Sequence, residues 1–323
     1  MRSSPRFLPM VRRCARAGRR GGALVLPSRP FQGGRASAIY ERQQKQNQPI
    51  FDEFVKLAQR LLPTPEEGSA SVLDVASGPG EPALSMAAAM PHINVTVSDL
   101  EPDNLAIAKR RAEKLPNVVG FEVQDATALT AFPDASFDLV TMSYGLMFVE
   151  DREKCVHELH RVLKPGGELL LSYWKEMKVV TLARRVLDDT VRAVPVVVVT
   201  GGEPSDASGG PPPMPDPTAL AQQGLAEKLL AKKFDVAETK TGSYSFYHAS
   251  ADEAFEAATL PARGALVAHA EATGDEAAVW AAARVSFDAA CAEAGYGPRD
   301  DGSYVVGPNE WNLAIALKSP CDK

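Results

Sequence analysis

The sequence predicts an α/β protein with a doubly wound, mainly parallel β-sheet. Beyond residue 70, short apolar runs alternate with helical segments at the spacing of repeated β-α units. Such units place their strands parallel, joined by right-handed crossovers. The 323 residues are 45% apolar and 24% charged, which is ordinary globular composition.

Each element of this fold has its own signal, beginning with an amphipathic helix over residues 39–62. Apolar residues recur there at helical spacing, and Pro63 and Pro65 end the pattern. Five strands are then predicted, at residues 71–76, 94–98, 118–123, 137–142 and 168–173. The intervening helices are predicted at residues 82–90, 102–115 and 152–163.

The pattern changes after Trp174. A helix over 179–194 precedes a loop or lid over 195–217, in which residues 201–217 are too rich in Gly, Pro and Ser for regular structure. A helix over 218–232, a strand over 234–247 and a final strand over 311–317 follow. Residues 251–296 hold eighteen alanines in 46 positions and predict two or three helices, broken near Pro261 and Gly274. Insertions at this place lie near the carboxyl edge of the sheet, where α/β proteins bind their ligands, so we expect a helical cap over the bound substrate rather than a separate domain.

Composition excludes several classes of protein. No run of eighteen apolar residues occurs, so no transmembrane segment is predicted. The four cysteines are widely separated and form no pair with metal-ligand spacing. Neither a disulfide framework nor a metal site is therefore expected.

The N-terminal segment differs in charge from the rest. Residues 1–35 hold nine arginines and no acid, and the remaining chain holds 26 basic against 41 acidic residues. We interpret residues 1–37 as an organelle presequence, with the mitochondrion favoured over the plastid. A basic tail that binds an acidic partner is the alternative. The acidic body argues against nucleic acid as a partner.

The most informative motif is a glycine turn between the first strand and its helix. Gly78-x-Gly80-x-x-Ala83 lets the backbone approach a ligand closely, and the start of the helix favours negative charge. Alone, this loop also fits a dinucleotide fingerprint, because Asp99 lies where a ribose-binding acid is expected.

Three further features narrow the choice. Asp74 lies within the first strand, Asp125 follows the third, and Pro165-Gly166-Gly167 separates a helix from the fifth strand. Together they resemble the class I S-adenosylmethionine-dependent methyltransferases, closest to the small-molecule branch that includes the quinone-biosynthesis methyltransferases. The resemblance spans residues 71–174.

This resemblance implies a Rossmann-like, seven-stranded, mainly parallel sheet, S-adenosyl-L-methionine as cofactor, and a set of cofactor-binding residues. Asp99 would accept hydrogen bonds from both ribose hydroxyls, and Leu100 would pack on the adenine. Ser143 would lie where the sulfonium and the acceptor meet. The others are the loop residues Ala76, Ser77, Gly78 and Gly80 with Asp74 beneath them, and Asp125 and Ala126 at the adenine. Taken alone, Asp125 is equally well a helix N-cap.

Two departures from the family pattern matter. Ala76 replaces the usual glycine, so we expect its φ to be negative. The stretch from Tyr144 to Phe148 lacks the histidine found in many O-methylating relatives, which excludes a histidine base there. His248 could reach the acceptor pocket as a base, but the favoured interpretation is a sheet-edge histidine with a structural partner.

The leading functional hypothesis is methyl transfer to a small-molecule acceptor, with Tyr144 and the aromatic segment Tyr244–Tyr247 shaping its pocket. Because no histidine lies in the cofactor motifs, we expect an acceptor that is already nucleophilic, such as a thiolate, carboxylate or free amine. A non-catalytic organellar assembly or scaffold protein is the alternative, and a nicotinamide dehydrogenase comes third. The sequence specifies neither the acceptor nor the oligomeric state.

Overall fold

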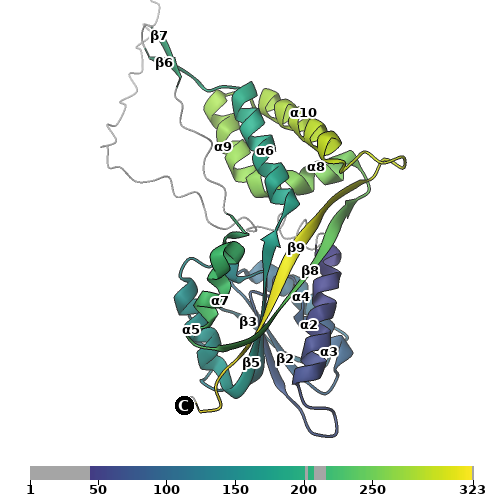
Figure 1. Cartoon of the computed structure of the whole chain (residues 1–323), viewed down its shortest axis with the longest axis vertical. Coiled ribbons are helices and arrows are strands. Elements are labelled where there is room, and N and C mark those ends of the chain that lie inside the picture. The colour runs from purple at the N-terminus through teal and green to yellow at the C-terminus, as the bar shows by residue number, and fades with distance from the viewer. Residues whose placement is uncertain (1–43, 201–202, 207–215, 322–323) are drawn as a thin grey trace, which may run out of the picture.

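The computed structural model describes residues 44–200, 203–206 and 216–321. Figure 1 shows a sheet with helices on both faces and, beyond one end of it, a bundle of helices. Two long strands, β8 and β9, run from the sheet to the bundle. The expected presequence, residues 1–37, lies outside the described residues.

The sheet has seven strands in the order β3-β2-β1-β4-β5-β9-β8. β1 to β5 are parallel, whereas β9 is antiparallel to both β5 and β8. The predicted doubly wound, mainly parallel sheet is therefore confirmed. Its strands are β1 (Ser71–Val75), β2 (Asn94–Asp99), β3 (Val118–Val123), β4 (Phe137–Ser143), β5 (Leu163–Glu176), β8 (Asp235–His248) and β9 (Tyr304–Leu317).

Helices cover both faces of this sheet. One face carries α2 (Gln48–Leu61), α3 (Ala83–Ala89) and α4 (Pro102–Arg111), and the other carries α5 (Arg152–Val162) and α7 (Leu225–Leu230). α2 turns Ile50, Phe54 and Leu57 into the core and its polar residues to solvent. Burying side chains of this size contributes roughly 1.5–3 kcal/mol each, which exceeds what helix propensity supplies.

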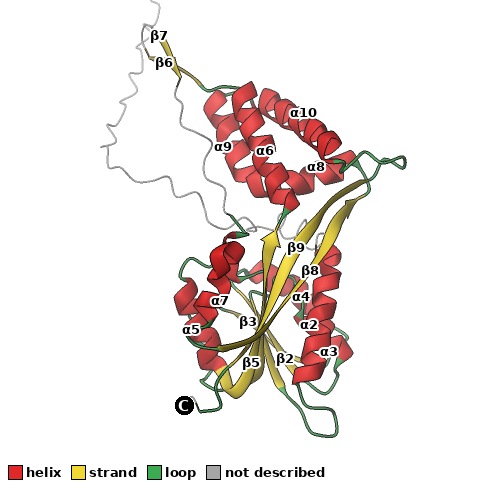
Figure 2. Ribbon diagram, viewed as in Figure 1, coloured by secondary structure: helices red, strands yellow, loops and turns green. Residues whose placement is uncertain are grey.

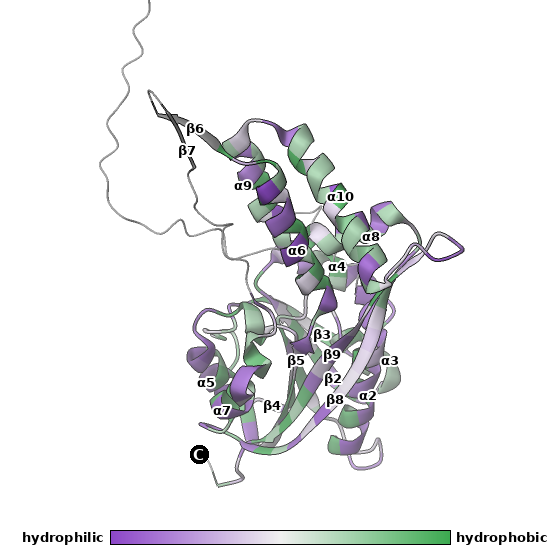
Figure 3. Cartoon of the chain, turned by 45° about the horizontal axis from the view of Figure 1, so that its top comes forward, coloured by the Kyte–Doolittle hydropathy of each residue, from purple (hydrophilic) through white to green (hydrophobic). Residues whose placement is uncertain are grey.

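The second part of the molecule is a helical bundle with its own apolar core. Its members are α6 (Lys178–Ala193), α8 (Ala251–Thr259), η4 (Leu260–Ala262), α9 (Arg263–Thr273) and α10 (Glu276–Ala294). Leu187, Leu266 and Phe287 are buried in it, surrounded mostly by alanine and valine. In Figure 3 the alanine-rich α10 is coloured mainly as hydrophobic. The alanine-rich insertion thus folds as helices, and α6, which precedes it by more than fifty residues, belongs to the same bundle.

Two elements link the two cores. β8 and β9 pair over their whole length, and Tyr304 and Val306 at the start of β9 belong to the bundle core. Phe246 and Met177 pack against both cores. Asn309 is fully buried at the joint, where its Oδ1 accepts a hydrogen bond from Lys178 N (2.8 Å) at the start of α6.

Three local expectations need correction. Residues 201–217 were expected to lack regular structure, but β7 (Glu203–Asp206) pairs with β6 (Val197–Thr200) in a two-stranded ribbon, visible in Figure 2. The helix expected over 218–232 is divided into η3 (Ala219–Gly224) and α7, because Gln223 and Gly224 adopt positive φ. The last strand begins at Tyr304 rather than at residue 311, because pairing with β8 resumes beyond Gly307 and Pro308 and continues to Tyr304.

The helices within the described part of the chain include none that is both long and apolar enough to cross a membrane.

Candidate cofactor and acceptor site

The candidate site lies where the strand order reverses. β1 is flanked by β2 on one side and β4 on the other, and all three are parallel. Their carboxyl ends therefore meet at one edge, which is where open α/β sheets bind ligands. Asp99 and Ser143 are the last residues of β2 and β4, and Asp74 is the last but one of β1.

The loop after β1 keeps the tight shape that glycine permits. Ser77 N donates to Ser98 O (3.0 Å), which ties the loop to the end of β2. Gly78 and Gly80 have φ of +57° and +107°. A Cβ at Gly80 would lie 2.7 Å from a Leu84 methyl carbon and 3.1 Å from the Cβ of Ala108, so the packing of α3 and α4 also requires glycine there.

The expectation that Ala76 keeps a negative φ is wrong, since its φ is +54°. The alanine therefore adopts the conformation of the glycine that it replaces, at a cost of about 1 kcal/mol or more. Space for its methyl group comes from Gly145, where an added Cβ would lie only 2.9 Å from the Cβ of Ala76. The loop after β4 is thus in direct contact with the loop after β1.

Asp74 is fully buried beneath the loop. Its carboxylate accepts hydrogen bonds from the hydroxyls of Ser77 and Thr141 (2.6 Å for Thr141). Burial raises the pKa of Asp74 to about 7, although both hydrogen bonds act to lower it. The residue joins β1, the glycine loop and β4.

Asp99 is buried and organises the neighbouring loop. Its Oδ2 accepts from Gly78 N (2.8 Å), and its Oδ1 accepts from Glu101 N (2.9 Å) and Asn104 Nδ2 (3.2 Å). Beside it, Leu100 is 38% exposed, unusual for a leucine next to a buried strand. The Oδ1 of Asn104 is buried without a hydrogen-bond partner in the described chain. An orphaned acceptor of this kind is rare in folded proteins and points to a missing donor.

Asp125 and Ala126 lie farther along the same edge, after β3. Asp125 is exposed, and its Oδ1 accepts from both the backbone N and the hydroxyl of Thr127 (2.8 Å each). These bonds close a turn, and the next described element is β4 rather than a helix. The N-cap interpretation of Asp125 is therefore wrong. The next residue, Ala126, is buried.

An aromatic cluster, defined here as Tyr144, Trp174, Tyr244 and Phe246, lies beyond the end of β4. The rings of Tyr144 and Trp174 stack with centroids 4.2 Å apart and planes 4° apart. Tyr244 and Phe246 pack against Trp174 at 5.6 and 6.1 Å. Ser143 is held beneath this cluster by its contact with the Ser172 hydroxyl (3.1 Å).

Sequence reasoning missed several residues that the fold brings to this site. Trp174 was recognised only as a boundary, although an aromatic residue at the end of a parallel strand is a usable signal. Asn47, Asn104 and Gly145 carry no such signal, because a single polar residue or glycine becomes meaningful only through its neighbours in space.

His248 lies at the end of the edge strand β8, opposite Tyr304. It is 2% exposed, and neither ring nitrogen has a hydrogen-bond partner among the described residues. The expectation that a structural partner holds this ring is therefore wrong. Burial lowers the pKa of His248, because it disfavours the charged form of the ring. Its strand partner Tyr304 belongs to the bundle core and not to the aromatic cluster.

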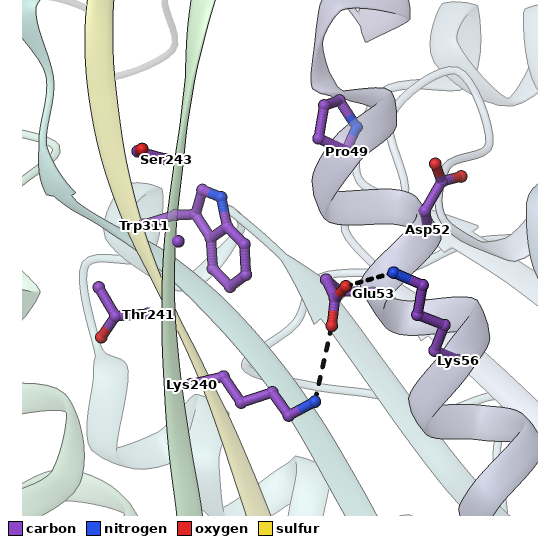
Figure 4. A pocket seen from close by; sticks show the side chains of 9 residues that line it. Pro49, Asp52, Glu53, Lys56, Lys240, Thr241, Ser243 and Trp311 are labelled. Atoms are coloured by element: carbon purple, nitrogen blue, oxygen red, sulfur yellow. Dashed lines mark hydrogen bonds and ion pairs between the residues drawn. The ribbon is translucent and has the colours of Figure 1, made fainter.

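A groove lies between α2 and the strand pair β8–β9. Figure 4 shows Glu53 between Lys56 and Lys240, with the indole of Trp311 on the strand side. Glu53 is 2.6 Å from Lys56 Nζ and 3.6 Å from Lys240 Nζ. The ammonium groups of both lysines are therefore paired with Glu53. Gly242 allows the indole to lie across β8, since a Cβ there would be 2.2 Å from the ring.

The strand order and the helices on both faces of the sheet define a Rossmann-like α/β protein, in which ligands bind at the carboxyl edge that holds the glycine loop and the two buried aspartates. Comparison with known families narrows this class. Residues 73–171 match the family model described as "Methyltransferase domain". The resemblance to the class I S-adenosylmethionine-dependent methyltransferases is thereby confirmed over that stretch.

Curated relatives match the same part of the chain. A demethylmenaquinone methyltransferase from Thermus thermophilus is 42% identical over 106 residues, which are 33% of this chain and 48% of the relative. The 2-methoxy-6-polyprenyl-1,4-benzoquinol methylase, mitochondrial, from Caenorhabditis elegans is 36% identical over 112 residues, 34% of this chain and 39% of the relative. The chain thus spans less than half the length of both relatives.

Among solved structures, the [4+2]-cyclase SpnF is similar with a TM-score of 0.49 and 24% identity, covering 83% of this chain and 81% of that one.

Proposed function

We propose that this protein is an S-adenosylmethionine-dependent methyltransferase that acts on a small planar acceptor. The observation that carries the proposal is the buried, orphaned Oδ1 of Asn104 beside Asp99, next to the glycine loop. It marks a position that expects a hydroxyl donor, and the two ribose hydroxyls of the cofactor are such donors.

The number of available acceptor positions supports this assignment. A carboxylate offers about four lone-pair sites. Asp99 already accepts three hydrogen bonds within the protein, so about one site remains for a ribose hydroxyl. Asn104 Oδ1 supplies the second, which modifies the expectation that Asp99 alone accepts from both hydroxyls. The exposed side chain of Leu100 would pack on the adenine, with Asp125 and Ala126 beyond it.

The methionine end of the cofactor would lie on residues 76–80, above Asp74. The cofactor supplies an electrophilic methyl group when bound. That methyl group would pass directly to a nucleophilic atom of the acceptor, and the electron pair of the carbon–sulfur bond would stay on sulfur. This displacement needs alignment and exclusion of water rather than an acid–base pair. A closed aromatic cluster beside Ser143 suits that requirement.

The cluster also supports a planar acceptor. The face of Trp174 is already covered by a parallel six-membered ring, that of Tyr144. Offset or parallel stacking of aromatic rings contributes about 0.5–1.5 kcal/mol beyond burial. An aromatic acceptor packed against this cluster would gain a contact of the same kind, and the relatives' names refer to quinone-type compounds.

We further propose import into mitochondria with removal of residues 1–37, the plastid being the alternative. The arginine-rich, acid-free segment supports this, as does the word "mitochondrial" in the name of the nematode relative. N-terminal sequencing of the native protein is the test. A sequence that starts between Pro27 and Ala38 is expected, and one that starts at Met1 contradicts the proposal.

Two measurements test the activity. The first compares the binding of S-adenosylmethionine with that of NADH, and the second screens for methylated products with labelled cofactor. Micromolar binding of the first and none of the second is expected, with label in a low-molecular-weight product. Preference for NADH would favour the dehydrogenase alternative. Cofactor binding without any labelled product in the presence of cell extracts would favour a scaffold role.

A further inference from the structure

One face of α4 follows the glycine loop from end to end. Asn104, Ala108 and Arg111 are four and three residues apart, a spacing that places them on one side of a helix. Asn104 Nδ2 donates to Asp99 Oδ1 (3.2 Å), and a Cβ at Gly80 would lie 3.1 Å from the Cβ of Ala108. Arg111 is the last residue of α4 and reaches the far end of the loop. The helix thus contacts the proposed ribose position and the proposed methionine position.

Arg111 joins two points of the loop. Its Nη1 donates to the carbonyl oxygen of Pro79 (2.8 Å), and its Nη2 donates to Glu81 Oε1. The other carboxylate oxygen of Glu81 accepts from the backbone N (3.2 Å) and the hydroxyl (2.7 Å) of Ser85. The side chain of Glu81 is more than nine-tenths buried. The guanidinium therefore neutralises a buried carboxylate while it fixes the carbonyl group two residues before it.

The two halves of the loop are anchored to different elements. In the first half, residues 77–78, Gly78 N donates to Asp99 Oδ2 (2.8 Å) at the end of β2. In the second half, residues 79–81, the last two N–H groups donate to Ser77 O (3.0 and 3.2 Å), which closes a turn within the loop itself. Arg111 ties this second half to α4. Its loss should therefore loosen the second half and leave the first half in place.

We propose that Arg111 and Glu81 are positioning residues that hold the second half of the glycine loop in the shape that binds the amino-acid end of the cofactor. The inference rests on the proposed methyltransferase function and deepens it. In that function the adenosine end lies at Asp99 and Leu100, whereas the methionine end lies on residues 76–80. The pair should thus set the preference of the site for S-adenosyl amino acids over nucleosides that lack the amino acid.

The size of the effect follows from the charges involved. A hydrogen bond that involves a charged group contributes about 10- to 150-fold to an equilibrium constant. Arg111→Met removes two such bonds, those to Pro79 and Glu81. It also leaves the buried carboxylate of Glu81 without a cation beside it, which is strongly unfavourable. The second half of the loop should therefore leave its present shape in this variant.

The test compares two ligands that share the adenosine and the thioether. S-adenosylhomocysteine carries the amino-acid end, and methylthioadenosine lacks it. Calorimetric titration of the full-length protein with each ligand gives an affinity ratio that does not depend on turnover. Arg111→Met is expected to weaken the binding of S-adenosylhomocysteine by at least about 10-fold and that of methylthioadenosine by less than about 3-fold.

Two further variants make the result specific. Arg111→Met/Glu81→Gln removes the unpaired buried charge and should keep the fold if the single variant does not. Its affinity ratio should fall as well, because the carbonyl group of Pro79 still lacks its donor. The matched control is Arg110→Met, which removes the same charge from an exposed neighbour on α4 and should bind both ligands as the wild-type protein does.

A wild-type affinity ratio in the folded variants would overturn the proposal. Equal weakening of both ligands would do the same, because it would show that the two side chains act only on the stability of the fold. If the wild-type protein bound neither ligand, the proposed function itself would be contradicted, so the two failures are distinguishable.

Discussion

The cores of the sheet and of the helical bundle are packed with side chains of different size. The core of the sheet is built from large residues, with Phe54, Leu73 and Tyr173 almost completely buried. The bundle core is built largely from alanine and valine around a few large residues, of which Phe287 is the biggest that is fully buried. Small side chains bury less apolar area each, so the bundle depends more on each of its large residues.

The two parts also differ in what they contribute to the proposed site. The proposed cofactor residues all lie on the sheet part, between Asp74 and Ser143. The bundle contributes none of them, but it adjoins the aromatic cluster through Phe246, which packs against both cores. Its position supports a role as cap for the acceptor rather than in cofactor binding.

Truncating one large residue in each core gives the largest expected effects. Phe54→Ala and Phe287→Ala should each destabilise their own part by about 3–5 kcal/mol. Calorimetric unfolding should show that Phe287→Ala broadens or splits the transition, with binding of S-adenosylmethionine retained. Phe54→Ala should weaken cofactor binding and global stability together. If Phe287→Ala abolished cofactor binding as well, the two parts would be one cooperative unit.

Removing the central carboxylate of the cofactor site should have the next largest effect. Asp99→Ala is expected to weaken S-adenosylmethionine binding by about 10- to 150-fold, because hydrogen bonds to a charged group contribute roughly 1.5–3 kcal/mol. Asn104→Ala should cost about 2- to 10-fold, since a neutral acceptor is lost. Calorimetric titration measures both. Unchanged affinity in a folded Asp99→Ala protein would refute the assignment.

The buried carboxyl group of Asp74 should make the stability of the sheet part depend on pH. Its pKa is raised to about 7 in the folded protein and is about 3.9 in an unfolded chain. The folded state therefore binds more protons between these values, so Asp74 makes the free energy of unfolding fall as pH rises from about 4 to about 7. Asp74→Asn should flatten this slope in urea titrations at several pH values. An unaltered slope would show that Asp74 is not the titrating group.

The positive φ of Ala76 predicts a small gain. Ala76→Gly should relieve backbone strain and stabilise the loop by up to about 1 kcal/mol, partly offset by greater flexibility of the unfolded chain. Gly145→Ala should do the opposite, because its methyl group would meet Ala76 and Met142. Thermal unfolding of both variants and of the double variant Ala76→Gly/Gly145→Ala provides the check. Rescue of Gly145→Ala by the second change is expected.

The smallest expected effect on chemistry is that of His248. Its ring is buried and, within the described structure, has no hydrogen-bond partner and no ring contact with the aromatic cluster. His248→Ala should therefore change kcat by less than about 10-fold, whereas loss of a general base costs about 10²- to 10⁴-fold. A loss above 10³-fold with intact cofactor affinity would establish a base and contradict chemistry by alignment alone.

Local patterns in the sequence are sufficient to predict the sheet and the position of the glycine loop. Alternating apolar runs, glycines at 78 and 80 and acids at 74, 99 and 125 are local patterns, and local patterns set strand identity and which residues reach the carboxyl edge. The aromatic segment at 244–247 was visible for the same reason.

The way in which distant residues combine could not be read from such patterns and is seen only in the folded chain. Asn47 and Tyr244 meet across 197 positions, Gly145 makes room for Ala76, and α6 joins the alanine-rich helices in one core. The φ of Ala76 could not be predicted from alanine's own preference, because the space for its methyl group depends on a residue in another loop. All three cases have the same cause, because hydrogen bonding and packing act over a few ångströms in space. How far apart two residues are in the sequence does not tell how far apart they are in space until the sheet has formed.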